Sequence, residues 1–307
     1  MASTEHECGT VFIFGCGAVG SALGRALVRV GVPLAGAHCR TRASATRAAS
    51  LLGRVVTHGE IPVSLRRADT VVVAVPDPAI RGVAEQLAVH VVRHQVALHC
   101  SGSRSSDDLA PLRPLLRGVA SFHPLLSFAD PLSASDILSS AAFALEGDDA
   151  ALDVARDLAR TLGGFPIDVP AADRVLYHAA AATASNHLVA LAAQAASCLR
   201  KIGLEQGQAV RALVPLMRST LANLERLGLP LALTGPVSRG DAGAVRAHLH
   251  AIRERAPEEE APYLALARRA AVVARAQGKA TAEQLAEVER TLSGEPARSG
   301  DRSCKST

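Results

Sequence analysis

Short apolar runs alternate with amphipathic segments along the first half of the chain. The runs predict buried strands at 11–14, 34–38, 70–75, 96–99, 119–122, 142–146 and 166–169, with a weaker candidate at 55–56. Helical periodicity lies between them, at 21–30, 43–52, 61–67, 80–92, 107–116 and 149–162, and a proline-rich loop is expected over 124–136. This alternation predicts an α/β fold with a Rossmann-type doubly wound parallel sheet.

From Ala172 onward the pattern is helical only. Helices are predicted at 173–202, 205–228, 241–256, 258–277 and 281–292. Gly203 would end the first of them, and Thr281 with Gln284 forms a capping box for the last. We therefore expect a nucleotide-binding domain over 9–170, a helical domain for substrate binding or dimerisation over 171–292, and a disordered tail over 293–307.

A glycine motif separates the first predicted strand from the first helix. Gly15, Gly17 and Gly20 have the G-x-G-x-x-G spacing of a dinucleotide site, in the required strand–turn–helix context. The helix N-terminus would hold a pyrophosphate through backbone N–H groups. An ordinary glycine turn is the alternative. The motif predicts cofactor-binding roles for Gly15, Cys16, Gly17, Ala18, Val19 and Gly20.

The end of the second strand indicates which dinucleotide binds. NAD sites place an acidic residue there, but this chain has Arg40, Thr41 and Arg42, with Ser44 close behind. Guanidinium groups grip a phosphate through paired hydrogen bonds, so the pattern favours NADP over NAD. A solvated arginine loop is the alternative.

Two further loops follow predicted strands and are expected at the cofactor edge of the sheet, because ligands of open α/β sheets bind beyond the carboxyl ends of the strands. They contain Val75, Pro76 and Asp77 in one, and Ser101 and Gly102 in the other.

Composition limits the remaining choices. The net charge is +4 over 307 residues, and no basic run is interleaved with aromatic residues, so no nucleic-acid partner is expected. Six cysteines without a C-x-x-C pair suit a reducing compartment. No signal peptide or membrane span is recognised, which predicts a cytoplasmic protein. No metal site is expected either, since His248 and His250 would point apart on a helix.

Several motifs together carry a family resemblance. Besides the glycine motif they are Val75-Pro76-Asp77, His99-x-Ser101-Gly102, Ser121-Phe122-His123-Pro124, Tyr177-His178-Ala179-Ala180, Ser185-Asn186-His187 and Thr234-Gly235-Pro236-x-x-Arg239-Gly240-Asp241. Over about 11–292 the chain resembles an uncharacterised family of Rossmann-like NADP oxidoreductases with a helical domain of unknown function, related to pyrroline-5-carboxylate reductase, ketopantoate reductase and the beta-hydroxyacid dehydrogenases. The resemblance implies NADP binding and a homodimer formed through helices, but no particular substrate.

The chain departs from two of these relatives at the proton donor. The resemblance to the beta-hydroxyacid dehydrogenases and ketopantoate reductases implies a lysine four residues before an asparagine on the first helix of the second domain. Here Asn186 is present, but Ala182 stands at the lysine position and no lysine occurs before Lys201.

Other polar groups on the same predicted helix could act instead. His178 is the first candidate acid, since an imidazole can donate a proton near neutrality, and Tyr177 is the second. Asn186 would orient the substrate, and Ser185 lies near the same face. The alternative is that His178 and Asn186 are polar groups bonded across a helix interface.

Two residues elsewhere are candidates for substrate contact. His123 follows a strand and could reach the expected interdomain cleft, or could simply cap a loop. Arg239 could clamp a substrate carboxylate, or could pair with Asp241, which is well placed as a helix N-cap.

Two functions follow from these residues. The first is an NADPH-dependent reductase of a small carbonyl or imine, with a ketopantoate-like keto acid as the most concrete substrate and a ring imine as the next. The second is a non-catalytic NADP(H)-binding sensor or assembly protein that keeps the fold.

Overall fold

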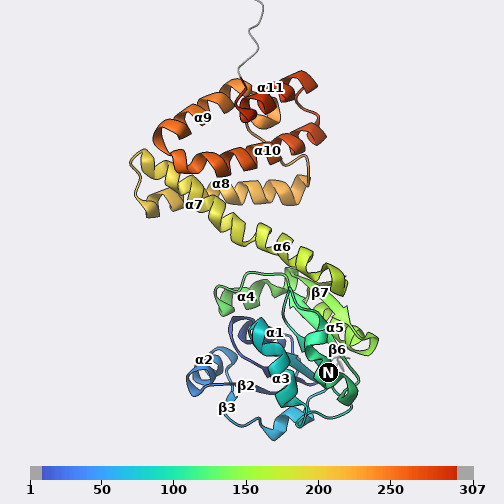
Figure 1. Cartoon of the computed structure of the whole chain (residues 1–307). Helices are drawn as coiled ribbons and strands as arrows, with labels where there is room; N and C mark the ends of the chain where they lie inside the picture. The colour runs from blue at the N-terminus through green and yellow to red at the C-terminus, as the bar shows by residue number, and fades with distance from the viewer. Residues whose placement is uncertain (1–8, 296–307) are drawn as a thin grey trace, which may run out of the picture. The chain divides into compact units, whose positions relative to one another are not determined.

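A computed structural model of the chain describes residues 9–295 (Figure 1). Its contacts divide the chain into two compact units after Ser185. The domain boundary expected near Pro170 therefore precedes one helix, α6 (Arg174–Ala184), that the contacts group with the sheet. Most of the tail expected to be disordered, 296–307, lies outside the described residues.

The first unit contains one eight-stranded sheet in the order β3-β2-β1-β4-β5-β6-β7-β8. Its first six strands are mutually parallel in the 3-2-1-4-5-6 order of Rossmann folds. β7 runs antiparallel to β6, and β8 is parallel to β7. The strands are β1 (Val11–Phe14), β2 (Leu34–Cys39), β3 (Thr57–His58), β4 (Thr70–Val73), β5 (Val96–His99), β6 (Gly118–Pro124), β7 (Ala142–Gly147) and β8 (Phe165–Asp168).

Helical layers cover both faces of this sheet, which is why its central strands are mostly apolar. Ile13 and Leu98 point to the face covered by α1, α2, α4 and α5, whereas Phe12 and Val73 point to the face covered by α3 and a 3-10 segment. The α-helices of the first unit are α1 (Ala18–Arg29), α2 (Arg42–Leu52), α3 (Ile80–Leu87), α4 (Pro131–Ile137), α5 (Asp149–Thr161) and α6.

Several local predictions for this unit were wrong. The strand at 55–56 is displaced to β3, α3 ends at Leu87, and the helix expected over 107–116 is a 3-10 segment, Ser106–Leu115. Pro111 and Pro114 lie within that segment, where each lacks the N–H of a regular helix. The loop expected over 124–136 contains α4, whose start is capped by the carboxylate of Asp130.

The second unit is helical, as predicted. Its α-helices are α7 (Asn186–Lys201), α8 (Gln206–Leu227), α9 (Ala242–Arg255), α10 (Glu260–Gln277) and α11 (Ala282–Ser293). The capping box of Thr281 and Gln284 is present at the start of α11. A small core of α9, α10 and α11 includes Val245, Leu249 and Val288.

The single helix expected over 173–202 is two helices, α6 and α7, separated by a turn at Ser185, whose φ is −110° and ψ −71°. Ser185 and Asn186 are side chains that compete with helical backbone hydrogen bonds. Within 9–295, no helix is long and apolar enough to span a membrane.

Candidate functional site

The glycine loop has the geometry that a pyrophosphate site requires. Gly15 has φ +95°, a conformation that side chains rarely adopt, and its N–H donates to the carbonyl oxygen of His38. A Cβ on Gly20 would overlap the carbonyl oxygen of Gly15, so only glycine lets α1 approach this turn so closely. A Cβ on Gly17 would instead meet nothing within 4 Å. The loop is therefore tightly packed against the protein at Gly15 and Gly20 and has open space beside Gly17.

The start of α1 is suited to an anion. Gly17 is its N-cap, no side chain caps it, and its first turn contains no acidic residue. The N-terminal N–H groups of a helix and its dipole both favour negative charge. The residues present thus fit the pyrophosphate of a dinucleotide.

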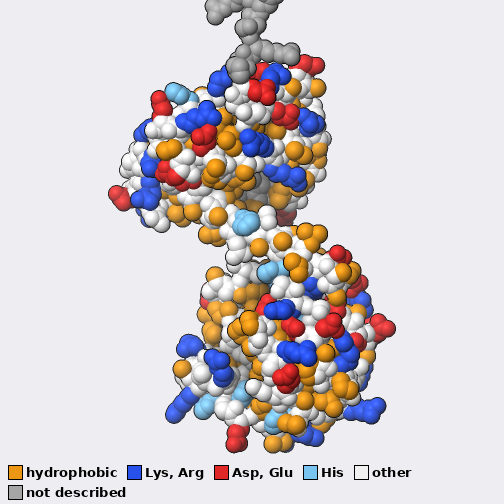
Figure 2. All heavy atoms as spheres, viewed as in Figure 1, with side chains coloured by type: hydrophobic (Ala, Val, Ile, Leu, Met, Phe, Trp, Pro, Cys, Tyr) orange, Lys and Arg blue, Asp and Glu red, His pale blue; other side chains and the backbone are white. Residues whose placement is uncertain are grey.

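The basic segment after β2 is exposed, as a 2′-phosphate site would need. Thr41 is the N-cap of α2 and accepts a hydrogen bond from the N–H of Ser44, which leaves the hydroxyl of Thr41 partly occupied. The side chains of Arg40 and Arg42 are exposed and, within the part of the chain the structure describes, neither guanidinium group has an ion pair or a hydrogen bond. Elsewhere on the visible face of each unit, basic and acidic side chains are interspersed (Figure 2).

The loops after β4 and β5 are joined at the same edge of the sheet. The hydroxyl of Ser103 donates to Oδ2 of Asp77 over 3.0 Å. A Cβ on Gly15 would lie 2.7 Å from Cγ1 of Val75, so the loop after β4 borders the glycine loop directly. Ser101 and Gly102 are buried beside it.

A group of polar rings lies against Gly102. His123 lies near the carboxyl end of β6, two residues after Ser121, and Ser121 pairs with His99 of β5. Its Nδ1 is 2.8 Å from the hydroxyl oxygen of Tyr177 on α6. A Cβ on Gly102 would lie 2.9 Å from Nε2 of His123 and 2.8 Å from Cδ2 of His178. Three predicted residues, His123, Tyr177 and His178, are therefore brought together.

The sequence reasoning did not single out Arg174, the first residue of α6. Its side chain is 1% exposed, and it is the largest side chain buried so completely among residues 9–295. Nη2 donates to the carbonyl oxygen of Ser101 over 2.7 Å and to the hydroxyl of Ser121, while Nη1 is 3.4 Å from the carbonyl oxygen of Ala144. Its Nε has no hydrogen-bond partner. The available signal was its spacing: Arg174 stands three residues before Tyr177 and four before His178, and such positions adjoin on one face of a helix.

The rings are held uncharged by their surroundings. Burial, and then the positive charge of Arg174, lower the pKa of His123 to about 4. Burial also raises the pKa of Tyr177 to about 12. Burial lowers the pKa of His99, whose Nδ1 accepts the N–H of Ser101 and whose Nε2 therefore carries the proton it donates to the carbonyl oxygen of Ser105. At neutral pH, Arg174 is thus the cation at the centre of these neutral groups.

The remaining predicted residues are not part of this group. Ser185 ends α6, and Asn186 begins α7 in the second unit. Arg239, also in the second unit, is exposed at the end of a 3-10 turn, and Asp241 accepts the N–H of Ala244 as the N-cap of α9. Asp241 is the N-cap that the sequence suggested, while roles for Asn186, Ser185 and Arg239 in substrate binding stay predictions.

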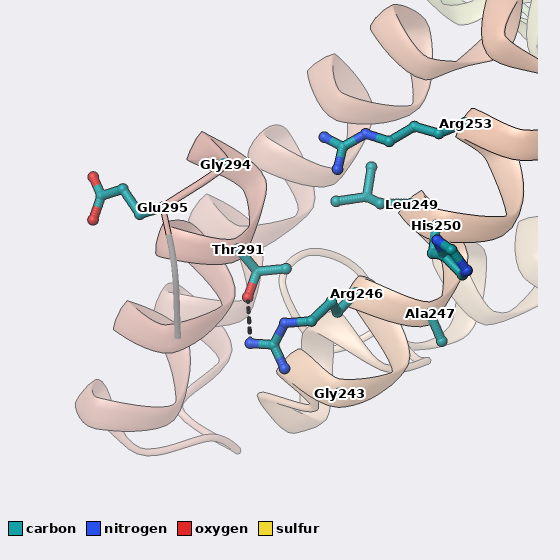
Figure 3. A pocket seen from close by; sticks show the side chains of 9 residues that line it. All are labelled: Gly243, Arg246, Ala247, Leu249, His250, Arg253, Thr291, Gly294 and Glu295. Carbon is teal, nitrogen blue, oxygen red and sulfur yellow. Dashed lines mark hydrogen bonds between the residues drawn. The ribbon is translucent and has the colours of Figure 1, made fainter. Parts of the chain in front are cut away.

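A surface cavity of about 720 Å³ lies in the second unit, between α9 and α11 (Figure 3). Its guanidinium groups already have partners: Arg246 contacts Glu287 at 3.1 Å and Thr291 at 3.3 Å, and Arg253 contacts Glu260 at 2.7 Å. None of the predicted site residues lines it. We assign this cavity no role in the function.

The ordered sheet, the glycine loop and the helical second unit define a Rossmann-type protein with an added helical domain. Two family models match the chain: a Rossmann-like domain over residues 5–120 and a domain of unknown function, DUF2520, over residues 141–270. The chain is therefore similar to Rossmann-like domains over its first part and to DUF2520 domains over most of the rest. No curated protein matches its sequence.

Solved structures share this fold. The "putative NADP oxidoreductase" of Bacteroides fragilis is 20% identical, with a TM-score of 0.66 over 85% of this chain and 97% of its own. The 1-pyrroline-5-carboxylate reductase of Streptococcus pyogenes is 14% identical, with a TM-score of 0.59 over 93% and 97%. The reductive aminase of Aspergillus terreus, solved with NADPH and ethyl levulinate, is 16% identical, with a TM-score of 0.59 over 92% and 98%.

Proposed function

We propose that this protein is an NADPH-dependent reductase of a small carbonyl or imine compound, with a ketopantoate-like keto acid among the candidate substrates. The observation that carries the proposal is the hydrogen-bonded pair of His123 and Tyr177, which lies against Gly102 at the carboxyl edge of a sheet with a dinucleotide-type glycine loop. The similar structures named above include proteins described with NADP or NADPH.

The cofactor would be held by backbone and guanidinium groups. Residues 15–20 would bind the pyrophosphate, and Arg40, Thr41 and Arg42 would bind the 2′-phosphate. The loops containing Val75 to Asp77 and Ser101 with Gly102 would border the nicotinamide. When bound, NADPH supplies a hydride, and the protein must supply the proton and the substrate contacts.

The geometry favours Tyr177 over His178 as the proton donor. The hydroxyl of Tyr177 is half-buried and hydrogen-bonded to an imidazole, whereas His178 is exposed. An alkoxide is much more basic than a phenolate, so proton transfer from Tyr177 to a reduced carbonyl is downhill even with its pKa raised to about 12. His123, kept neutral, can then pass a proton from solvent to the phenolate. His178 remains the second candidate donor.

A non-catalytic NADP(H)-binding protein is the other candidate function. The absence of a lysine at the position of Ala182 favours it, because the related dehydrogenases use a lysine there. Two measurements distinguish these functions. Purified protein is titrated with NADPH by calorimetry, and NADPH oxidation is then followed with a panel of ketones, 2-keto acids and cyclic imines. Binding with turnover supports the reductase, and binding without turnover supports the sensor.

We also propose that the protein is a cytoplasmic homodimer, formed through the helical unit. Large apolar side chains are exposed on α7 and α8, among them Val189 at 70%, Leu216 at 62% and Leu221 at 51%. Exposed apolar residues gathered on neighbouring helices are typical of interaction surfaces. The free thiols of Cys16, Cys39, Cys100 and Cys198 are consistent with a reducing compartment.

A further inference from the structure

We propose that Arg174 makes the site selective for carbonyl compounds, whose C=O group is neutral, and against iminium ions. The inference rests on the reductase function proposed above and narrows its substrate class. Arg174 carries a buried positive charge that has no acidic partner. The guanidinium group of Arg174 is held by carbonyl and hydroxyl oxygens of Ser101, Ser121 and Ala144, and among residues 9–295 no carboxylate lies within ion-pair distance of it.

This charge lies beside the groups that would meet the substrate. Cζ of Arg174 is 5.7 Å from the centroid of the Tyr177 ring, and Tyr177 is hydrogen-bonded to His123. The carbonyl oxygen that Arg174 binds belongs to Ser101, directly before Gly102. The cation therefore fixes the turn on which His123 and His178 pack, and its positive charge acts on Tyr177.

Two carboxylates near these groups, Asp77 and Glu146, form no ion pair with Arg174, although the charge of Glu146 acts on it from a distance. Asp77 accepts a hydrogen bond from Ser103, and Glu146 accepts both the N–H and the hydroxyl of Ser106 at 2.8 Å each. His99 is buried and neutral, and His178 lies with its ring centroid 6.4 Å from that of His123. At His123 the effect of Arg174 exceeds that of Asp77.

Carbonyl reduction benefits from this arrangement. A hydride from the bound NADPH joins the carbonyl carbon, the π electron pair of the C=O bond moves to oxygen, and Tyr177 gives that oxygen its proton. The product is an alcohol, and Tyr177 regains a proton from solvent through His123. Negative charge develops on the oxygen during hydride transfer, and a fixed cation in a low-dielectric site stabilises it.

Iminium reduction gains nothing from either group. An iminium ion is positive before the hydride arrives, so the guanidinium group repels it as it binds. Hydride addition to its carbon turns it into a neutral amine, and no proton donor is needed at that step. A buried cation and a tyrosine donor together therefore serve the carbonyl class.

The test compares cyclopentanone with the permanently charged N-methyl-1-pyrrolinium ion as substrates of the full-length protein with NADPH. We expect kcat/KM to be higher for the ketone. In Arg174→Met the ratio of ketone to iminium kcat/KM should fall at least tenfold, while Arg174→Lys, which keeps the charge, should hold the ratio within about threefold. Calorimetry with NADPH checks that each variant still binds the cofactor.

Each outcome bears on one proposal. A wild-type protein that reduces the iminium ion faster than the ketone overturns the inference and leaves the reductase intact, even if Arg174→Met does not fold. Equal losses for both substrates in both variants also overturn it, because Arg174 would then act only through structure. Binding of NADPH without turnover of either class contradicts the proposed function itself.

Discussion

The hydroxyl of Tyr177 lies 2.8 Å from Nδ1 of His123. This contact joins helix α6 to the carboxyl end of strand β6. Neither residue is near the other in sequence, and their rings meet edge to face with centroids 5.6 Å apart. The chain has a second pair of the same kind in its other unit, Tyr263 with Nδ1 of His248 at 3.0 Å. One pair thus provides a control for the other.

Replacing Tyr177 with Phe should remove the proton donor. We expect kcat for a carbonyl substrate to fall about 100-fold or more, the usual size of a general-acid contribution, with the Kd for NADPH changed less than threefold. Tyr263→Phe makes the same chemical change at the matched pair and should leave kcat unaltered. Steady-state kinetics and calorimetry measure both. If Tyr177→Phe keeps its full kcat, the donor would instead be His178, and His178→Gln should then reduce kcat.

His123 should make the fold less stable in acid. Its pKa is about 4 in the folded protein and near 6.5 in an unfolded chain, so the unfolded state binds the proton more readily. Stability is therefore complete above pH 6.5 and is lost as the pH falls towards 4, by about 3 kcal/mol from this group. In urea unfolding titrations carried out between pH 8 and pH 4, the free energy of unfolding of His123→Gln should fall less with decreasing pH than that of the wild type. His248→Gln, at an exposed histidine, is the control. If the free energy of unfolding of His123→Gln keeps the wild-type dependence on pH, the lowered pKa assigned to His123 is contradicted.

Replacing Arg40 and Arg42 together with Gln should weaken NADPH binding at least tenfold and leave NADH binding unchanged, because only NADPH carries the 2′-phosphate. Calorimetry with both nucleotides measures the two affinities. Arg269→Gln, an exposed arginine on α10, should change neither. Equal losses for NADH and NADPH would show that the two arginines do not recognise the phosphate.

Two glycines of the loop should respond differently to alanine. At Gly20 the added methyl group would overlap the carbonyl oxygen of Gly15, so Gly20→Ala should destabilise the fold by about 1–3 kcal/mol. At Gly17 the methyl group meets no protein atom, so Gly17→Ala should keep the wild-type Tm and lose NADPH affinity because the methyl stands in the cofactor's path. Thermal melts with and without NADPH separate the two effects, and a Gly17→Ala protein with full affinity would place the pyrophosphate elsewhere.

A charge on α8 should disrupt the proposed dimer. Leu216→Glu puts a carboxylate on the exposed apolar surface of this helix and should shift the mass measured by light scattering from dimer to monomer. Val63→Glu, at a residue 76% exposed in the first unit, is the control and should not change the mass. A monomeric wild-type protein would exclude the dimer at once.

Patterns within one segment were sufficient for most of the fold. The buried run of β1, the glycine spacing and the helix after it form a local unit, so the tight turn at Gly15 followed from the sequence, although α1 begins at Ala18 and not at the predicted position 21. Residues 185–186 and 131–137 were harder, because a single serine breaks α6 from α7 and a proline at a capped N-terminus starts α4 where a loop was expected. In both places the balance between helix and turn depends on a few side-chain hydrogen bonds that periodicity does not register.

By itself, the sequence determined the fold class and the glycine loop, because strand burial, glycine spacing and helix periodicity are properties of neighbouring residues. Only the tertiary structure decided which polar side chains meet. Arg174, Ser101 and Ser121 come from three separate segments, and the hydrogen bonds of the Arg174 side chain, at the start of α6, join them. The physical reason is that a buried cation needs oxygen partners from whichever strands end beside it, and the order of strands in the sheet sets those partners.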